Sequence, residues 1–376
     1  MEHALHAQLP AATIIASAPG RVNLIGEHTD YNGFPVLPLA IDRHVWIAAA
    51  PLREPILRIR SIDPARYPGE EIALADLRTR TRRGSWTDYV VAAARCRTPT
   101  RGIELLVAGD IPPEAGLSSS SALVVASFLA LGEPGERTAL AEQARRAERY
   151  VGTLSGGMDH AISLLARRGH ALRIDFRPLR TQAVPVPESL GIVVAHSGVR
   201  AAKSGTAREG YNARVRECLE AARQMGAAEN GLLADVPGRN RAALTVRLED
   251  PLLRQRARFV FQEARRVEAA VDALRRADLG ALGELLNASH AGLRDDYQVS
   301  HPAVDALVSR ALAGGADGAR VLGAGFGGCI VAVCERDRAA ALVASLGEQA
   351  WVFAPSGPAL RRSVHSGPPA FTEAAG

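Results

Sequence analysis

The sequence predicts a protein of mixed helices and strands that folds as more than one domain. Its 376 residues suffice for two or three domains with sizeable cores. Predicted strands and helices alternate loosely along the chain, and Pro178, Pro185 and Pro187 punctuate one long connection between them. We therefore place a domain boundary in this connection, with a first domain at 1–187 and a second at 188–376.

The individual elements follow from the lengths of the apolar runs. Short apolar runs predict strands, and longer runs with one apolar face predict helices. In the first domain we expect strands at 13–16, 45–50, 56–60, 102–108 and 170–176, and helices at 87–97, 122–131 and 136–150, with a further helix ending at 166. In the second domain we expect strands at 191–196 and 330–333, and helices at 211–225, 251–276, 280–293 and 302–313.

Charge and cysteine content exclude several classes of protein. The net charge of +5 is small and scattered, and the densest basic run, 78–83, fits a solvated loop better than a nucleic-acid patch. No apolar run approaches the ~18 residues of a membrane span, and no signal peptide precedes the first strand. The four cysteines show neither metal-type nor disulfide-type spacing. We therefore expect a cytoplasmic protein that binds neither nucleic acid nor membrane.

A polar, glycine-punctuated stretch at 18–33 follows the first predicted strand. Loops held between regular elements often carry functional sites. Four ionisable side chains fall within ten residues of one another here: Arg21, Glu27, His28 and Asp30. A simple turn would need only Gly, Asn and Ser. A solvated loop with surface charges is the alternative interpretation.

Two further stretches suggest phosphate and metal chemistry. At 109–121 a glycine and four serines precede a predicted helix, and such a helix start presents free N–H groups that bind phosphate. Plain N-capping is the alternative, although one serine would be enough for it. Glu148 and Asp159 flank a glycine-rich turn, so one could hold a metal and the other accept a proton. A helix-end charge paired with an Asp N-cap is the competing interpretation.

A third stretch, 321–329, matches G-x-G-x-x-G through Gly323, Gly325 and Gly328. A dinucleotide site would open a helix at this pattern, but an apolar run that predicts a strand follows it. We therefore reject a Rossmann site, and a tight turn is the simplest interpretation. A Walker A motif is also excluded, because Lys203-Ser204 follows Ala202 rather than glycine.

These three stretches, in this order, resemble the motifs of galactokinases, which belong to the GHMP kinase superfamily. The stretch 18–33 is similar, almost letter for letter, to their sugar-binding signature, and the serine run is similar to their ATP-phosphate motif. The resemblance implies an α+β fold of two lobes. The N-terminal lobe would be similar to ribosomal protein S5 domain 2 and the C-terminal lobe to a ferredoxin-like sandwich, with the active site between them.

The resemblance also implies roles for individual residues. Asp159 would accept the proton of the anomeric hydroxyl, with Arg21 beside it, and Ser120 and Glu148 would ligate Mg²⁺. Trp86 would lie along the adenine, or else serve as a core aromatic. Sugar contacts would come from Glu27, His28, Asp30, Gly156 and Tyr211. Nucleotide contacts would also come from Glu114, Ala115, Gly116, Leu117, Ser118, Ser119 and Ser120.

Two positions depart from the family pattern. Glu114 stands where many bacterial galactokinases have glycine, and His160 stands where the family has glutamine beside the catalytic aspartate. Because histidine titrates near neutral pH, we expect His160 to add a feature to the pH profile. Lys203 is the only lysine of the chain, and it either approaches the substrates or survives by chance on a solvated loop.

The resemblance thus implies a monomeric galactokinase that uses ATP and Mg²⁺ to convert galactose to galactose 1-phosphate. Alternatives are an N-acetylgalactosamine 1-kinase, a related sugar 1-kinase, or a non-catalytic galactose sensor. The serine run is intact, and Arg21 and Asp159 are present, so the sequence favours catalysis over sensing.

Overall fold

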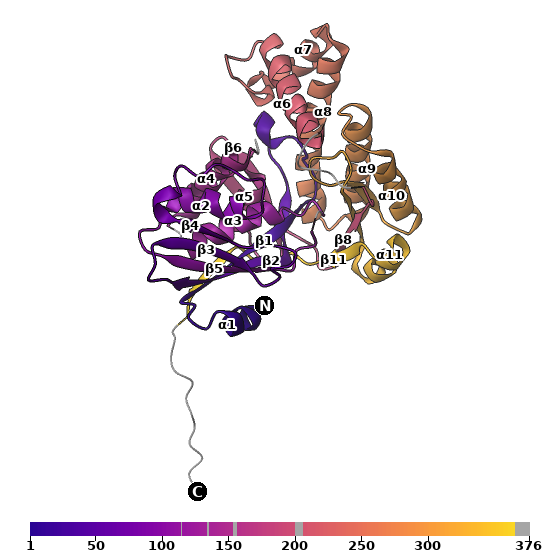
Figure 1. The fold of residues 1–376 in the computed structure, drawn as a ribbon. Coiled ribbons are helices and arrows are strands. Elements are labelled where there is room, and N and C mark those ends of the chain that lie inside the picture. The colour runs from indigo at the N-terminus through magenta and orange to yellow at the C-terminus, as the bar shows by residue number, and fades with distance from the viewer. Residues whose placement is uncertain (114, 134, 153–155, 200–205, 365–376) are drawn as a thin grey trace.

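The computed structural model describes residues 1–113, 115–133, 135–152, 156–199 and 206–364. Two groups of elements lie side by side (Figure 1). The N-terminal lobe is built on a six-stranded sheet, and the C-terminal lobe on a four-stranded sheet. A third, two-stranded sheet belongs to the N-terminal lobe.

The N-terminal sheet has the strand order β12-β1-β2-β5-β3-β4, with β3 parallel to β5 and the other neighbours antiparallel. Helices α2 to α5 gather on one face and the short α1 lies on the other (Figure 1). The strands are β1 (Ile14–Asn23), β2 (Pro38–Pro51), β3 (Ile56–Ser61), β4 (Glu70–Ala73), β5 (Ile103–Gly109) and β12 (Leu360–Ser363). The helices are α1 (Glu2–Gln8), α2 (Thr87–Arg97), α3 (Ser119–Ala130), α4 (Arg137–Glu148) and α5 (Met158–Leu165).

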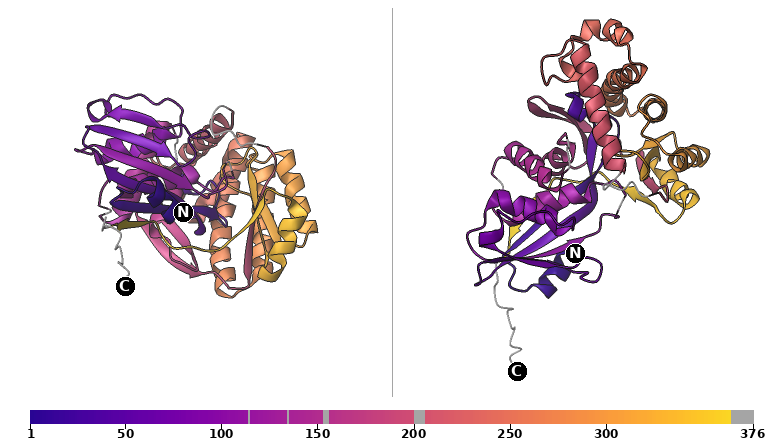
Figure 2. Two further views of the ribbon diagram at one scale, coloured as in Figure 1. Left: turned by 60° about the horizontal axis from the view of Figure 1, so that its bottom comes forward. Right: turned by 45° about the horizontal axis from the view of Figure 1, so that its top comes forward.

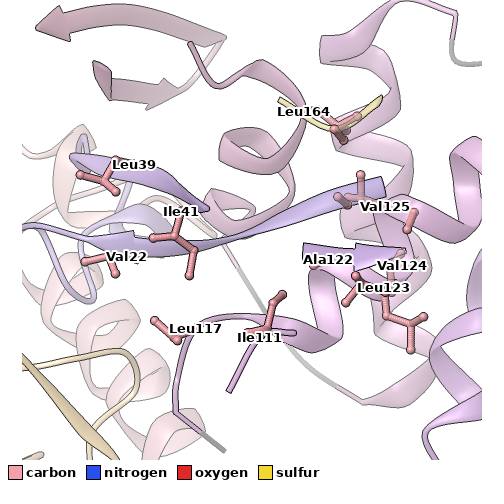
Figure 3. Packing of buried hydrophobic residues seen from close by; sticks show 14 of the residues in the cluster. Val22, Leu39, Ile41, Ile111, Leu117, Ala122, Leu123, Val124, Val125 and Leu164 are labelled. Atoms are coloured by element: carbon pink, nitrogen blue, oxygen red, sulfur yellow. The ribbon is translucent and has the colours of Figure 1, made fainter. Parts of the chain in front are cut away.

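Alternation along the strands explains the two apolar faces. In β2, Ile47 and Ala49 pack in the main core, whereas Ala48 and Ala50 face the cluster around Leu5 of α1. Successive strand residues point to opposite faces, so a strand covered on both sides is apolar throughout. Figure 3 shows the main core between the sheet, with Val22, Leu39 and Ile41, and helix α3, with its run from Ala122 to Val125.

A β-hairpin, β6 (His170–Phe176) with β7 (Leu179–Pro185), packs beside α5 and β2. The sequence indicated only a proline-punctuated connection here, whereas 179–185 forms a strand. Its prolines do not prevent this: Pro178 precedes β7 and Pro185 is its last residue, and strand ends tolerate proline.

The C-terminal sheet has the order β11-β8-β10-β9, and each neighbouring pair is antiparallel. Numbered along the chain, this is the 4-1-3-2 order of a ferredoxin-like sandwich, as the resemblance implied. The strands are β8 (Leu190–His196), β9 (Gly318–Val321), β10 (Cys329–Glu335) and β11 (Ala350–Phe353). The helices are α6 (Thr206–Gln224), α7 (Arg241–Arg247), α8 (Pro251–Arg275), α9 (Leu279–Asp295), α10 (Pro302–Ala313) and α11 (Ala339–Leu346).

The main hydrophobic core contains residues of both lobes, and one strand from the end of the chain joins the N-terminal sheet. In β8, Ile192 and Val194 belong to the cluster that contains the N-terminal sheet, while Val193 and Ala195 face the C-terminal helices. The yellow C-terminal segment returns to the N-terminal lobe (Figure 2, left), where β12 pairs with β1. The segment 188–376 therefore also contributes a strand to the N-terminal sheet.

Two motif boundaries differ from the expected ones. Strand β1 continues to Asn23, with an irregularity between Pro19 and Arg21, so the first part of the 18–33 stretch is strand and not loop. Helix α3 begins at Ser119, so three of the four serines lie in its first turn. In both cases the polar side chains project from regular secondary structure, and they point toward the same region of the N-terminal lobe.

Candidate active site

The pair formed by Arg21 and Asp159 joins three segments of the N-terminal lobe. Arg21 projects from β1 and is 6% exposed, and Asp159 is the second residue of α5. The Nε of Arg21 donates to Asp159 Oδ1 at 2.8 Å, and one terminal nitrogen donates to the carbonyl of Gly116 at 2.5 Å. Arg21 thus fixes the Asp159 carboxylate and, at the same time, the glycine that precedes the serine run.

The second oxygen of Asp159 is held by serine hydroxyls. Ser118 donates to Oδ2 at 2.5 Å, and Ser121 lies 3.5 Å from the same oxygen. Burial raises the pKa of Asp159, but the charge of Arg21, the Ser118 hydrogen bond and the charge of His160 outweigh it and lower that pKa overall. Asp159 is therefore an ionised carboxylate at neutral pH.

Glu148, the last residue of α4, is buried behind this pair. Ser121 donates to its Oε1 at 3.0 Å, and His160 Nε2 lies 3.2 Å from its Oε2. His160 is fully buried on the Glu148 side of α5. Ser121, which the sequence did not single out, therefore bridges the two carboxylates, while Ser120 shares a hydrogen bond with the hydroxyl of Tyr89.

The serine run and the third glycine motif lie against each other. A Cβ placed on Gly116 would lie 3.6 Å from the carbonyl of Leu322, at the start of that motif. The motif itself is a tight turn between β9 and β10, in which a Cβ on Gly325 would lie 2.2 Å from the carbonyl of Val299. The strand after the motif confirms that it is not a Rossmann site.

Glu27 is buried and binds to the C-terminal lobe. Its Oε1 accepts from the backbone N–H of Gly323 at 2.8 Å and from the two terminal nitrogens of Arg320 at 3.2 and 3.3 Å. The sugar signature and the third motif therefore meet at one carboxylate oxygen.

His28 has a left-handed backbone, with φ of 63°, and its ring lies among tyrosines. Its Nδ1 is 3.0 Å from the hydroxyl of Tyr31, which lies 2.7 Å from the hydroxyl of Tyr297. The ring centroid is 4.8 Å from that of Tyr297 and 5.6 Å from that of Tyr211. Burial, with help from nearby arginines, lowers the pKa of His28 to about 3, so the imidazole is neutral.

Asp30 packs against Gly156 so closely that no side chain fits there. A Cβ on Gly156 would lie 2.1 Å from Asp30 Oδ2. Burial raises the pKa of Asp30 to about 7, and the charges of Asp159 and Glu27 add to that rise. Burial and the charges of Asp30 and Asp159 also raise the pKa of Tyr211 well above its usual value, so these side chains share one environment.

The remaining predicted residues are less central. Trp86 is half-buried, packs against the main core and donates from Nε1 to the carbonyl of Pro68 at 2.9 Å, so both predicted roles stay open. Ala115 and Leu117 are buried, and the Leu117 carbonyl accepts from the backbone N–H of Arg21. Ser119 opens α3. Glu114 and Lys203 lie outside the described residues.

The sequence motifs did not indicate two charged side chains of the C-terminal lobe that bind the segment 23–27. Arg320 and Glu263 are fully buried and bond to residues 23–27. A signal was present: Arg320 interrupts an apolar strand, and Glu263 falls on the apolar face of a helix that also carries Val260 and Val267. Charged residues at core positions are rarely buried without a specific partner.

No group of three or more His, Cys, Asp and Glu side chains suited to a metal occurs in the described part of the chain. The same residues include no helix with the length and apolar character needed to cross a membrane.

Family models match three parts of the chain. The galactokinase galactose-binding signature matches residues 3–51, the GHMP kinase N-terminal domain matches 88–167 and the GHMP kinase C-terminal domain matches 270–351. The galactokinase of Roseiflexus sp. strain RS-1 is 43% identical over 336 residues, which cover 86% of this chain and 84% of that protein. The galactokinase of Chloroflexus aurantiacus is 40% identical over 350 residues, covering 89% and 87%.

A solved structure agrees with these matches. The crystal structure of Lactococcus lactis galactokinase complexed with galactose superposes with a TM-score of 0.85 at 29% identity, covering 92% of this chain and 95% of that one. Methanococcus jannaschii mevalonate kinase, at 15% identity and a TM-score of 0.65, shares the fold.

Proposed function

Because this chain belongs to the galactokinase family of the GHMP kinases, we propose that it transfers the γ-phosphoryl group of ATP to the C1 hydroxyl of galactose. The observation that carries the proposal is the ionised Asp159, held by Arg21 and Ser118 next to the start of α3. A carboxylate and a helix start so arranged suit a reaction between a hydroxyl and a phosphate.

Asp159 acts as the base in this proposal. Its Oδ2 takes the proton of the C1 hydroxyl as the sugar oxygen forms a bond to the γ-phosphorus and the bond from that phosphorus to ADP breaks. Ser118 already bonds to this oxygen and fixes its position. Phosphoryl transfer needs alignment and charge neutralisation more than covalent help from the protein.

Arg21 has two roles in this proposal. It keeps Asp159 ionised and correctly oriented through Nε, and its charge stabilises the negative charge that develops on the transferred group. The start of α3, at Ser119, then receives the phosphates, since a helix N-terminus presents backbone N–H donors and its dipole favours anions there.

The donor atoms around Glu148 fit Mg²⁺. Two carboxylates, Glu148 and Asp159, meet at the hydroxyl of Ser121, and this ion prefers hard oxygen ligands. It commonly uses only one or two carboxylates together with phosphates and water. Glu148 would hold it, with Ser120 as the hydroxyl ligand that the resemblance implies and Ser121 supporting Glu148. The ion would neutralise charge on the phosphates when bound.

The sugar would lie against the segment that carries Glu27, His28 and Asp30, with Gly156 and Tyr211 completing the set. A neutral His28 can donate or accept one hydrogen bond, and Asp30 can accept two. Glu27 has one oxygen engaged with the C-terminal lobe, which leaves Oε2 for a sugar hydroxyl.

The test is ATP-dependent phosphorylation of a sugar panel of galactose, N-acetylgalactosamine, arabinose and galacturonate. Galactose should show the highest kcat/KM. Preference for N-acetylgalactosamine would reassign the enzyme to another sugar 1-kinase, and binding of galactose without turnover would indicate a sensor. A monomeric state and a cytoplasmic location stay predictions.

A further inference from the structure

The backbone of the sugar signature is held by two buried charged side chains of the C-terminal lobe. Arg320, on β9, donates from Nε to the carbonyl of Leu24 at 2.8 Å and from a terminal nitrogen to the carbonyl of Asn23. Its other contacts are Glu27 and its own neighbour, the carbonyl of Val321. Arg320 is 0% exposed, so all of these bonds lie in the protein interior.

Strand geometry explains why the arginine reaches across. Ala319 and Val321, its neighbours on β9, pack in the core of the C-terminal lobe. Because side chains alternate along a strand, Arg320 projects from the opposite face, toward the end of β1. A planar guanidinium with five donors can bind several carbonyls and a carboxylate at once, which a lysine ammonium cannot do in the same geometry.

Glu263, on α8, holds the next turn of the same segment. Its Oε1 accepts from the backbone N–H of Gly26 at 3.0 Å and from the hydroxyl of Ser289 at 2.7 Å, while Oε2 accepts from Arg266. Gly26 has φ of 100° and packs so closely on α8 that a Cβ would lie 2.8 Å from a methyl of Val267. Glycine is therefore required where the segment meets the helix.

We propose that Arg320 and Glu263 are positioning residues for the sugar: they fix residues 23–27 in the shape that presents Glu27, His28 and Asp30 to it. This inference rests on the proposed sugar site. Neither residue touches the reacting atoms, and both act through the backbone that they hold. A preorganised segment binds more tightly because less conformational freedom is lost on binding.

The experiment measures KM for galactose, KM for ATP, kcat and Tm in Arg320→Lys and Glu263→Leu. We expect the galactose KM to rise about tenfold or more, with the ATP KM and kcat changed by less than about threefold. Arg97→Lys is the matched control, because Arg97 also donates through two nitrogens to two backbone carbonyls, those of Phe128 and Glu133, far from the sugar segment. It should lower Tm without changing the galactose KM.

Two further variants separate positioning from general stabilisation. Glu263→Gln keeps an acceptor oxygen for Gly26 and should restore most of the affinity lost in Glu263→Leu. Ser289→Ala removes a bond to the same oxygen but leaves Gly26 bound, so its galactose KM should stay near wild type. If Arg320→Lys does not fold, the Glu263 variants decide the question.

A merely structural role predicts lower Tm and less active protein with an unchanged galactose KM, and that result would overturn the inference. Calorimetry of galactose binding to the wild type distinguishes failure of the proposed function from failure of the positioning role. If the wild type does not bind galactose, the proposed function fails; if it binds and the variants bind equally well, only the positioning role fails.

Discussion

The reacting groups and the segment 23–27 of the sugar signature are held in place in opposite ways. Arg21, Ser118 and Asp159 hold one another within the N-terminal lobe, with hydrogen bonds of 2.5 and 2.8 Å. Residues 23–27 instead depend on Arg320 and Glu263 of the other lobe. A change at the first place should therefore act on kcat, and a change at the second on sugar affinity. The predictions below test this division.

The largest effect is expected for Asp159→Asn. The amide keeps the size and some hydrogen bonding of the carboxylate but cannot take the proton, so kcat should fall ~10²–10⁴-fold, as is usual for loss of a general base. Calorimetry on the same variant should show galactose binding near the wild-type level. A kcat close to wild type would mean that another group is the base.

Glu148→Gln should have the next largest effect. Loss of one hard, charged ligand should raise the Mg²⁺ concentration needed for half-maximal activity by roughly tenfold and lower kcat, with galactose binding unchanged. Glu104→Gln is a suitable control, because Glu104 is also a buried carboxylate but pairs with Arg60 on the N-terminal sheet. An unchanged Mg²⁺ titration would remove Glu148 from the metal site.

Asp30 should make both stability and sugar affinity depend on pH. Its pKa is about 7 in the folded protein, against about 3.9 for an unfolded chain. Between these values the folded state holds a proton that the unfolded state lacks, so stability should fall as pH rises from about 4 to 7, by at most ~4 kcal/mol. Melting of the ligand-free protein across this range should show the fall, and Asp30→Asn should flatten it.

Galactose affinity should change in the opposite direction. An ionised Asp30 accepts hydrogen bonds from sugar hydroxyls better than a protonated one, so the wild-type KM for galactose should rise as pH falls below about 7. The ATP KM measured in parallel is the control. A galactose KM that stays flat from pH 6 to 8 would place Asp30 away from the sugar.

His160→Gln is expected to have the smallest effect. The side chain is fully buried beside Glu148, so the substitution should change kcat at pH 8 by less than about threefold. It replaces an imidazole whose charge lowers the pKa of Asp159 with a neutral amide, so the acid limb of the pH profile should shift to higher pH. Superimposable profiles for the two proteins would show that His160 does not influence the reaction.

Much of the fold could be predicted from local patterns. Helices α2 and α10 begin and end where expected, and β3 and β8 differ from expectation by one residue. Two of the missed elements depend on tertiary partners. Strand β12, Leu-Arg-Arg-Ser, carries no local strand pattern and exists because β1 offers it an edge, and β7 was hidden by the prolines at its ends. Tertiary context overrides weak local preference in such segments.

The candidate site likewise has residues that the sequence indicated and residues that it did not. The sequence indicated Arg21, Asp159 and Glu148, because each stands in a motif with a chemical reason for its residue type. It could not show that Ser121 bonds to Glu148, since the helical turn decides which hydroxyl points toward that carboxylate. Nor could it show the bonds of Arg320 to Leu24 and Asn23, which lie 296 and 297 positions away along the chain.

The pairing of β12 with β1 has a consequence for synthesis. The register joins Ile14 to Ser363, and the backbone N–H of Val364 donates to the carbonyl of Thr13 at 2.8 Å. Until that segment leaves the ribosome, the outer edge of β1 has no partner, and an open strand edge is a template for wrong pairing between nascent chains. Completion of the sheet that carries Arg21 is therefore a late step, set by topology rather than by the stability of any local segment.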